Sequence, residues 1–206
     1  LYYGGVNIIN ATVSLKNVIF KDSLSEDTIN LIESNSTISN LKFINSKSDA
    51  LDIDSGSSNI NYVFCENIGN DCLDFSNSEA VVNNMFTNNI FDKSISIGEN
   101  SKVNITNIEI NNSEIGIAVK DNSEVKINSF YIKNSTLPIA VFVKKNEFGP
   151  AKLIVENMKI ESSNEIFLVD DRSYLEIDGK KYIGKELGGV IESYLYGNLY
   201  GRKTVR

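Results

Sequence analysis

Five aspartates in the middle of the chain have the residue type and the spacing that acid–base chemistry requires. They are Asp49, Asp52, Asp54, Asp71 and Asp74. Asp49 and Asp71 are 22 residues apart, as are Asp52 and Asp74, and Lys93 follows Asp71 by another 22. If one turn of the chain takes 22 residues, matching side chains lie about 5 Å apart on neighbouring turns. Like charges at that distance raise the pKa of each carboxyl group. The cluster therefore needs compensation, which can be a shared proton, a bound cation or an ion pair with a lysine.

Each form of compensation corresponds to a different use of the cluster. Two carboxyl groups about 5–5.5 Å apart are the acid and nucleophile of a retaining glycosidase, and the candidate catalytic residues are Asp52, Asp74 and Lys93. Calcium takes six to eight oxygen ligands and is the one candidate cofactor. Its candidate ligands are Asp49, Asp52, Asp71 and Asp74. A purely structural role stays open, because aspartates before strands bond turn amides and an acidic row discourages aggregation.

Lysines form a second candidate group beside these acids. Lyases that act on uronate polymers need a lysine or arginine to abstract the proton next to the carboxylate, often with calcium nearby. The predicted substrate-binding residues are Asp49, Asp71, Glu99, Lys120 and Lys144. The alternative is that Lys93, Lys120, Lys144 and Lys145 are solvated charges at strand ends, where they discourage lateral association.

The 22-residue spacing is a repeat of most of the chain. Six segments that begin at residues 27, 49, 71, 93, 115 and 137 align at this spacing, and a seventh begins at 164. Apolar residues alternate with period two in each segment, which predicts a strand with one buried face. The two predicted inward columns are Ile29, Leu51, Leu73, Ile95, Ile117, Ile139, Ile166 and Leu31, Ile53, Phe75, Ile97, Val119, Val141, Leu168. The longer last gap predicts a loop insertion at 144–150, which contains a Gly-Pro pair.

A second strand is predicted in each repeat, most clearly at 103–110 and 125–132. Asparagines recur at the predicted bends in two columns: Asn17, Asn40, Asn84, Asn107, Asn157 and Asn45, Asn67, Asn89, Asn112, Asn134. Asparagine tolerates left-handed backbone geometry and its stacked amides bond from turn to turn, so we interpret these columns as structural. No helical stripe is visible. The sequence therefore predicts an all-β fold, a right-handed single-stranded parallel β-helix (a β-solenoid) with about 22 residues per coil and seven to eight coils.

The domain organisation follows from the extent of the repeat. Residues 1–178 are predicted to form the β-helix and residues 179–206 a C-terminal capping segment, because both ends of such a rod expose strand edges. The predicted cap is rich in tyrosine, at Tyr182, Tyr194, Tyr196 and Tyr200. The N-terminal residues 1–5 are expected to join an upstream domain of the same polypeptide.

Composition narrows the function classes. The chain has no histidine, which removes Ser-His-Asp hydrolysis and ordinary zinc sites. A net charge of -7 argues against nucleic acid as a partner, and no apolar run is long enough for membrane insertion. Cys65 and Cys72 fall on inward positions that suit buried free thiols, and a disulfide between them stays open.

The columns and four phrases resemble the right-handed β-helix repeat family of the pectin-lyase-like superfamily. The phrases are Ser48–Ile53 (SDALDI), Gly69–Phe75 (GNDCLDF), Asp92–Glu99 (DKSISIGE) and Gly116–Asp121 (GIAVKD). More narrowly, they resemble β-helix regions of surface proteins that also carry CotH-like kinase modules. The resemblance covers roughly residues 4 to 178 and implies an extracellular or cell-surface location and a leaning towards polysaccharide. It does not imply one activity, because the superfamily holds lyases, hydrolases, epimerases and plain stalks.

Taken together, these observations predict an extracellular β-helix module with an acidic face that binds carbohydrate, a cation or both. A polysaccharide lyase or glycoside hydrolase that uses the stacked aspartates is the first alternative. A structural spacer is the second.

Overall fold

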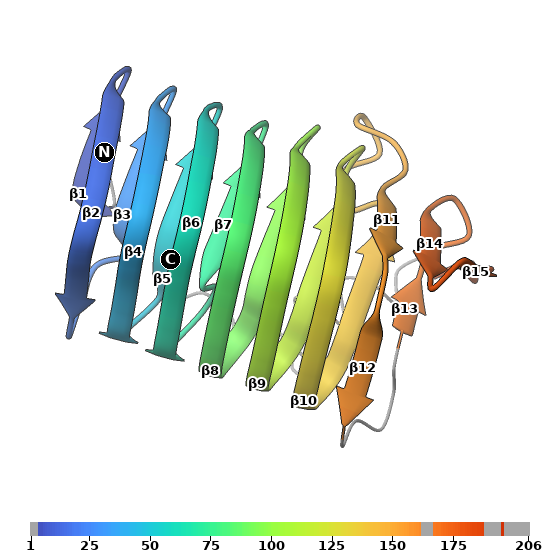
Figure 1. The fold of residues 1–206 in the computed structure, drawn as a ribbon. Helices are drawn as coiled ribbons and strands as arrows, with labels where there is room; N and C mark the ends of the chain where they lie inside the picture. Colours follow the sequence, from blue (N-terminus) through green and yellow to red (C-terminus); the bar gives the residue numbers. More distant parts are fainter. Residues whose placement is uncertain (1–3, 162–166, 188–194, 196–206) are drawn as a thin grey trace.

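The computed structural model confirms the predicted fold: stacked parallel coils about 22 residues apart form a β-solenoid of about eight turns. It describes residues 4–161, 167–187 and 195. The coils run from β1 and β2 on the left of Figure 1 to β14 and β15 on the right, and they wind in a right-handed sense.

Each coil contributes a strand to two layers. The first layer begins with β1 (Gly4–Ile9), β3 (Asp27–Ile32), β5 (Asp49–Asp54) and β7 (Leu73–Ser76). The second layer, in front in Figure 1, begins with β2 (Thr12–Lys21), β4 (Asn35–Ser46) and β6 (Ser57–Ile68). The long strands β8 (Glu79–Gly98), β9 (Lys102–Lys120) and β10 (Glu124–Phe142) start in the second layer and end in the first layer of the next coil. The rod continues through β11 (Lys152–Val155), β12 (Met158–Glu161), β13 (Phe167–Val169), β14 (Tyr174–Ile177) and β15 (Lys180–Tyr182).

The predicted inward columns form the core through six coils. Ile29, Leu51, Leu73, Ile95, Ile117 and Ile139 are neighbours in register and fully buried. The prediction for the seventh segment was wrong by one residue, because Phe167 pairs with Ile139 and Val169 with Val141. The insertion after Phe142 makes that spacing 28 residues instead of the predicted 27. A one-residue shift moves a side chain to the other face of a strand, so Leu168 lies outside the column that was predicted to hold it.

Asparagines make the bends, as predicted. Asn45, Asn67, Asn89, Asn112 and Asn134 all have positive φ. Their amides bond from coil to coil, for example from Asn67 to Asn45 (2.9 Å) and from Asn134 to Asn112 (3.0 Å). In the other column Asn17, Asn40 and Asn157 have positive φ, while Asn107 bonds Asn84 at 3.1 Å. Left-handed geometry is tolerable for asparagine, so the bends repeat without glycine.

Cys65 and Cys72 are fully buried, as expected, and they form the disulfide that the sequence had left open. Their Cα atoms are 6.0 Å apart, within the range for such a bond. The disulfide joins β6 to the residue before β7, across the bend that carries Asp71. It therefore fixes one edge of the predicted acidic site.

Candidate functional site

The predicted acids lie together on the outward side of the first layer. The column between the two inward columns holds Asn30, Asp52, Asp74, Ser96, Ala118, Ala140 and Leu168 in register. Asp27, Asp49 and Asp71 flank it on successive coils. We call Asp27, Asn30, Asp49, Asp52, Asp54, Asp71 and Asp74 the acid patch. Asp52 and Asp74, paired in register, are half-buried, so the patch is neither a flat solvated ladder nor a closed cavity.

Amides compensate part of the charge within the acid patch. Asn30 Nδ2 donates to Asp27 Oδ2 and to Asp52 Oδ2, both at 3.3 Å. Asp49 Oδ1 accepts from Asn70 Nδ2 (2.6 Å) and from the Asp71 amide (2.7 Å). The Oδ1 atoms of Asp74 and Asn30 are buried and have no hydrogen-bond partner among the described residues. A buried polar atom without a partner costs stability, so these two oxygens mark where compensation is incomplete.

Burial and mutual repulsion shift the pKa values of these acids upwards. Loss of solvation, followed by the charges of Asp74 and Asp54, raises the pKa of Asp52 to about 9. Burial and Glu26 raise the pKa of Asp27 to about 6. Burial and Asp71 raise the pKa of Asp49 well above its usual range. Asp52 is therefore protonated at neutral pH and has an O–H to donate.

Lys93 lies at the edge of the acid patch and is buried, with 3% of its surface exposed. Its Nζ donates to Asp92 Oδ2 (2.6 Å) and to Asp71 Oδ1 (3.4 Å), and its backbone amide also donates to Asp71 Oδ1 (3.0 Å). Burial raises the pKa of Asp71 to about 7, and the Lys93 charge opposes that shift. The alternative that Lys93 is a solvated strand-end charge is therefore wrong. A register shift in β8 between Ile90 and Lys93 precedes this residue and places it beside Ile115 of the next coil.

Lys120 is buried too, and it lies across the next coil. Its Nζ donates to Ser96 Oγ at 2.9 Å. A Cβ atom on Gly98 would lie 2.6 Å from Lys120 Cε, so a larger residue at this position would require the lysine side chain to shift. The solvated alternative is wrong for Lys120 as well. Lys93 and Lys120 thus bound the acid patch on its C-terminal side.

The insertion at 144–150 lies beside Glu99, at the far end of this array. Lys145 Nζ is 2.6 Å from Glu99 Oε1, and Ser76 Oγ donates to Glu99 Oε2 at 2.8 Å. Burial alone would raise the pKa of Glu99, but Lys145, Lys120 and Ser76 hold it below its usual value. Asp121 Oδ1 accepts the amides of Lys144 and Lys145, both at 2.7 Å, and so fixes the insertion to the coil. The predicted substrate-binding residues Glu99, Lys120 and Lys144 therefore occupy one end of the array and Asp49 and Asp71 the other.

Beyond Lys120 the same outward column is apolar. Ala118 and Ala140 are fully buried in a small cluster with Ile115, Leu137, Phe142 and Leu168. Leu187 and Leu195 from the C-terminal part of the chain complete that cluster. The predicted cap residue Tyr182 packs edge-on against Phe167 at 4.9 Å, while Tyr194, Tyr196 and Tyr200 lie outside the described residues. The boundary at 178/179 stays a prediction.

The calcium prediction has no ready-made geometry to support it. Within residues 4–161, 167–187 and 195, no group of three or more carboxylates could hold a metal ion. The Asn30 amide nitrogen, which points at Asp27 and Asp52, occupies space between two of the acids. The calcium ligands Asp49, Asp52, Asp71 and Asp74 stay a prediction.

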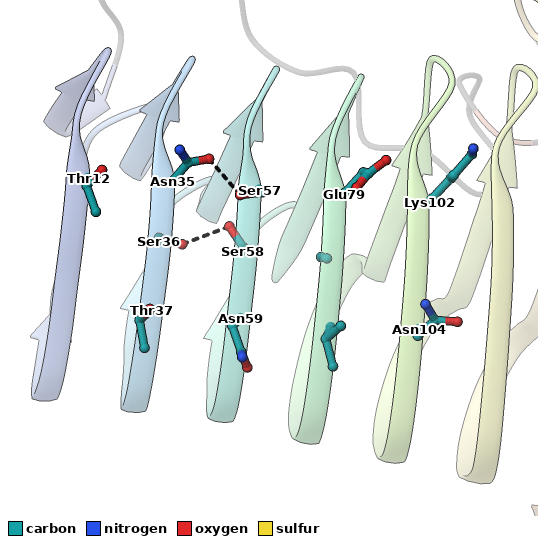
Figure 2. A pocket seen from close by; sticks show the side chains of 12 residues that line it. Thr12, Asn35, Ser36, Thr37, Ser57, Ser58, Asn59, Glu79, Lys102 and Asn104 are labelled. Atoms are coloured by element: carbon teal, nitrogen blue, oxygen red, sulfur yellow. Dashed lines mark hydrogen bonds between the residues drawn. The ribbon is translucent and has the colours of Figure 1, made fainter.

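A separate groove of about 510 Å³ lies on the second layer, across the starts of β4, β6, β8 and β9. Figure 2 shows its hydroxyl and amide side chains, with Ser57 Oγ donating to Asn35 Oδ1 (2.6 Å). Glu79 and Lys102 stand near its far end, and Val81 is exposed within it. The groove is a second concave surface of the molecule, and none of its lining residues belongs to the acid patch.

Two residues of the site were not predicted. Asn30 pairs in register with Asp52 one coil further on. The 22-residue spacing could therefore have predicted that the Asn30 amide lies beside the aspartates. Asp92 had no such signal, because the register shift beside it breaks the 22-residue spacing. Asp92 accepts the shortest hydrogen bond that Lys93 donates.

No protein-family model, curated protein or solved structure matches the chain. The structure therefore supports the fold of a parallel β-helix but assigns no family to it. Among the described residues no helix is long and apolar enough to cross a membrane.

Proposed function

We propose that the protein is an extracytoplasmic β-helix module that binds carbohydrate at its acid patch. One observation carries the proposal: Asp74 Oδ1 is buried beside the half-buried Asp52 and has no donor among the described residues. The same column holds fully packed alanines at Ala118 and Ala140. The fold can therefore fill this column without charge, and acids that raise one another's pKa need another reason to be there.

Sugar hydroxyls match the hydrogen-bonding groups of the patch. A hydroxyl both donates and accepts, so one ligand can donate to Asp74 and accept from the protonated Asp52. The negative charge of the other acids disfavours uronic acids and favours neutral or amino sugars. A lyase, by contrast, would require a uronate substrate.

The disulfide supports a location outside the cytoplasm, because buried disulfides persist in oxidising compartments. The repeat phrases that resemble pectin-lyase-like β-helices favour a polysaccharide ligand. Their likeness to regions beside CotH-like kinase modules favours a surface protein. The polysaccharide ligand and the surface location are both inferred from the resemblance of the sequence.

The test is binding to a glycan panel of neutral, amino and uronic oligosaccharides. We expect binding to neutral or amino sugars that Asp74→Ala weakens by about tenfold or more, since it removes the acceptor. Asp52→Asn keeps a donor in place and should retain most of the affinity. A matched control changes the other concave surface, with Asn59→Ala and Asn104→Ala, and should bind as the unmodified protein does. Loss of binding in the groove control alone would move the site to the second layer, and no binding at all would favour a spacer.

Retaining glycoside hydrolysis is the second candidate, because Asp52 is held protonated one coil away from Asp74. Coils stack about 4.8 Å apart, close to the separation of the acid and nucleophile in such enzymes. Asp52 would protonate the leaving oxygen as the glycosidic bond breaks and Asp74 bonds to the sugar carbon. A water molecule deprotonated by Asp52 would then replace Asp74 and release the sugar. The test is release of new reducing ends, and Asp52→Asn should abolish it while binding persists. Binding without turnover in the unmodified protein would reject this candidate.

A further inference from the structure

Three buried side chains at the edge of the first layer form a group that neither carbohydrate binding nor glycoside hydrolysis uses. Lys93, Asp71 and Asp92 have only 3%, 3% and 4% of their surfaces exposed. Lys93 Nζ lies 2.6 Å from Asp92 Oδ2 and 3.4 Å from Asp71 Oδ1. An amine between two carboxyl groups, shielded from bulk water, has the three components of amide formation: a nucleophile, an electrophilic carbon and a base.

Asp71 has the contacts of the carboxyl group that is attacked. Its Oδ1 accepts the backbone amide of Lys93 at 3.0 Å, and a donor at this atom stabilises the negative charge that develops there during attack. Burial raises the pKa of Asp71 to about 7, while the Lys93 charge opposes the shift. A large part of this carboxyl group therefore carries a proton at neutral pH. A protonated carboxyl group is open to attack by an amine, whereas a carboxylate resists it.

Asp92 has the contacts of the general base. Its Oδ2 accepts the hydrogen bond from Lys93 Nζ at 2.6 Å, so a proton can pass directly between the two atoms. Its other oxygen, Oδ1, is buried and has no hydrogen-bond partner among the described residues. A carboxylate with an unsatisfied buried oxygen is poorly stabilised as an anion, which favours uptake of the proton from Lys93.

The backbone holds the two coils against each other at this point. The Asp71 amide donates to Asp49 Oδ1 (2.7 Å), and the Asp71 carbonyl accepts from the Ala50 amide (2.9 Å). The Cys72 amide donates to the Lys93 carbonyl at 3.1 Å, and Cys72 is itself held by the disulfide. Reacting groups that are fixed in this way combine far faster than the same groups free in solution.

We propose that Lys93 and Asp71 form an isopeptide bond, an amide between their side chains, with Asp92 as general base and acid. Asp92 takes one proton from Lys93 Nζ, and the neutral amine attacks Cγ of the protonated Asp71. The Nζ–Cγ bond forms while negative charge collects on Oδ1. Asp92 then gives its proton to Asp71 Oδ2 and takes a second proton from Nζ, so that the Cγ–Oδ2 bond breaks and one water leaves. Nothing is oxidised or reduced, and the step is independent of carbohydrate binding.

The test is the mass of the whole chain, measured after folding, reduction of the disulfide and denaturation. We expect most molecules to be lighter than the sequence mass by one water. Cleavage after glutamate separates segment 67–79, which contains Asp71, from segment 80–99, which contains Lys93. We expect these two segments to stay joined in one product that lacks one water. The full sequence mass, or a loss of water confined to one segment, would overturn the proposal.

Variants separate the reaction from the fold, with circular dichroism to check that each one folds. Lys93→Arg keeps the positive charge, but a guanidinium does not lose its proton to become a nucleophile, so this variant should keep its full mass. Asp92→Asn removes the base and should react at least tenfold more slowly. Asp71→Asn should form the same bond with loss of ammonia in place of water. The matched control is Lys120→Arg, a second buried lysine whose Nζ donates to Ser96 Oγ, and it should still lose one water. Equal rates in Asp92→Asn and the unmodified protein would overturn the role of Asp92.

The same mass measurement counts the molecules that have not reacted. The ion pair between Lys93 and Asp71 is the state before the reaction, and it persists only in those molecules. Titration of Asp71, and the stability that its ion pair with Lys93 provides, therefore refer to the unreacted fraction.

Discussion

The outward side of the first layer is built in two contrasting halves on one repeating backbone. Over β5 and β7 the outward column holds Asp52 and Asp74, which are half-buried and incompletely paired. Over the ends of β9 and β10 it holds Ala118 and Ala140, which are packed beneath Leu187 and Leu195. The backbone register is the same in both halves. The acids are therefore not a requirement of the fold, because an apolar filling of the same column is available in the same molecule.

The largest effect is expected from placing an acid in the apolar half. Ala140→Asp buries a carboxylate among Leu137, Phe142 and Leu168, with no partner in that cluster. We expect a loss of about 4–5 kcal/mol in the free energy of unfolding. Denaturant unfolding measures it, with Ala140→Ser as the control of similar size. A loss below about 1 kcal/mol would mean that both halves accept charge equally.

The next effect concerns Lys93, which stands between the halves. Lys93→Met leaves Asp71 and Asp92 without their shared cation in a buried position, so we expect a loss of about 3 kcal/mol near neutral pH. Exposed Lys126→Met is the control and should change stability by less than about 0.5 kcal/mol. If the two variants lose the same stability, the ion pairs of Lys93 do not stabilise the boundary between the acidic and the apolar half.

A smaller effect of opposite sign is expected when the acid half is made to resemble the apolar half. Asp52→Ala with Asp74→Ala removes an unpaired buried oxygen and a carboxyl group that must take up a proton on folding at pH 8. We expect the free energy of unfolding to increase by about 1–2 kcal/mol at pH 8. The control is Glu109→Ala, an exposed acid on β9. Destabilisation of the double variant would show that the aspartates are structural after all.

The pH dependence is the most gradual effect, because it is spread over several pH units. A carboxyl whose pKa is raised on folding keeps its proton in the native state while the unfolded chain loses its own, so stability falls as pH rises. The decline should begin near pH 4, the usual carboxyl value, and extend through about 6 for Asp27, about 7 for Asp71 and about 9 for Asp52. The stability gained by the double alanine variant should therefore grow between pH 5 and pH 9. A gain that is constant with pH would contradict these shifts.

The sequence predicted most of the fold and about half of the site. Period-two alternation and the 22-residue spacing placed the coils, the inward columns and the asparagine bends, because each depends on local geometry that repeats. The burial of Lys93 and Lys120 could not be predicted in the same way. It depends on the register shift in β8, on Asp92, and on the space above Gly98, none of which repeats along the chain. The seventh coil was misplaced for the same reason, since one insertion changed its spacing.

Both proposed uses of the acid patch require Asp52 to be a carboxyl group that the protein holds protonated at neutral pH. Carbon-13 NMR of the aspartate side chains, followed from pH 3 to pH 10, measures this directly, with Asp52→Asn to assign the signal. We predict that the Asp52 carboxyl titrates near pH 9 and that Asp74→Ala moves this midpoint towards lower pH. A midpoint near 4 that Asp74→Ala leaves unchanged would show that the protein does not hold Asp52 protonated.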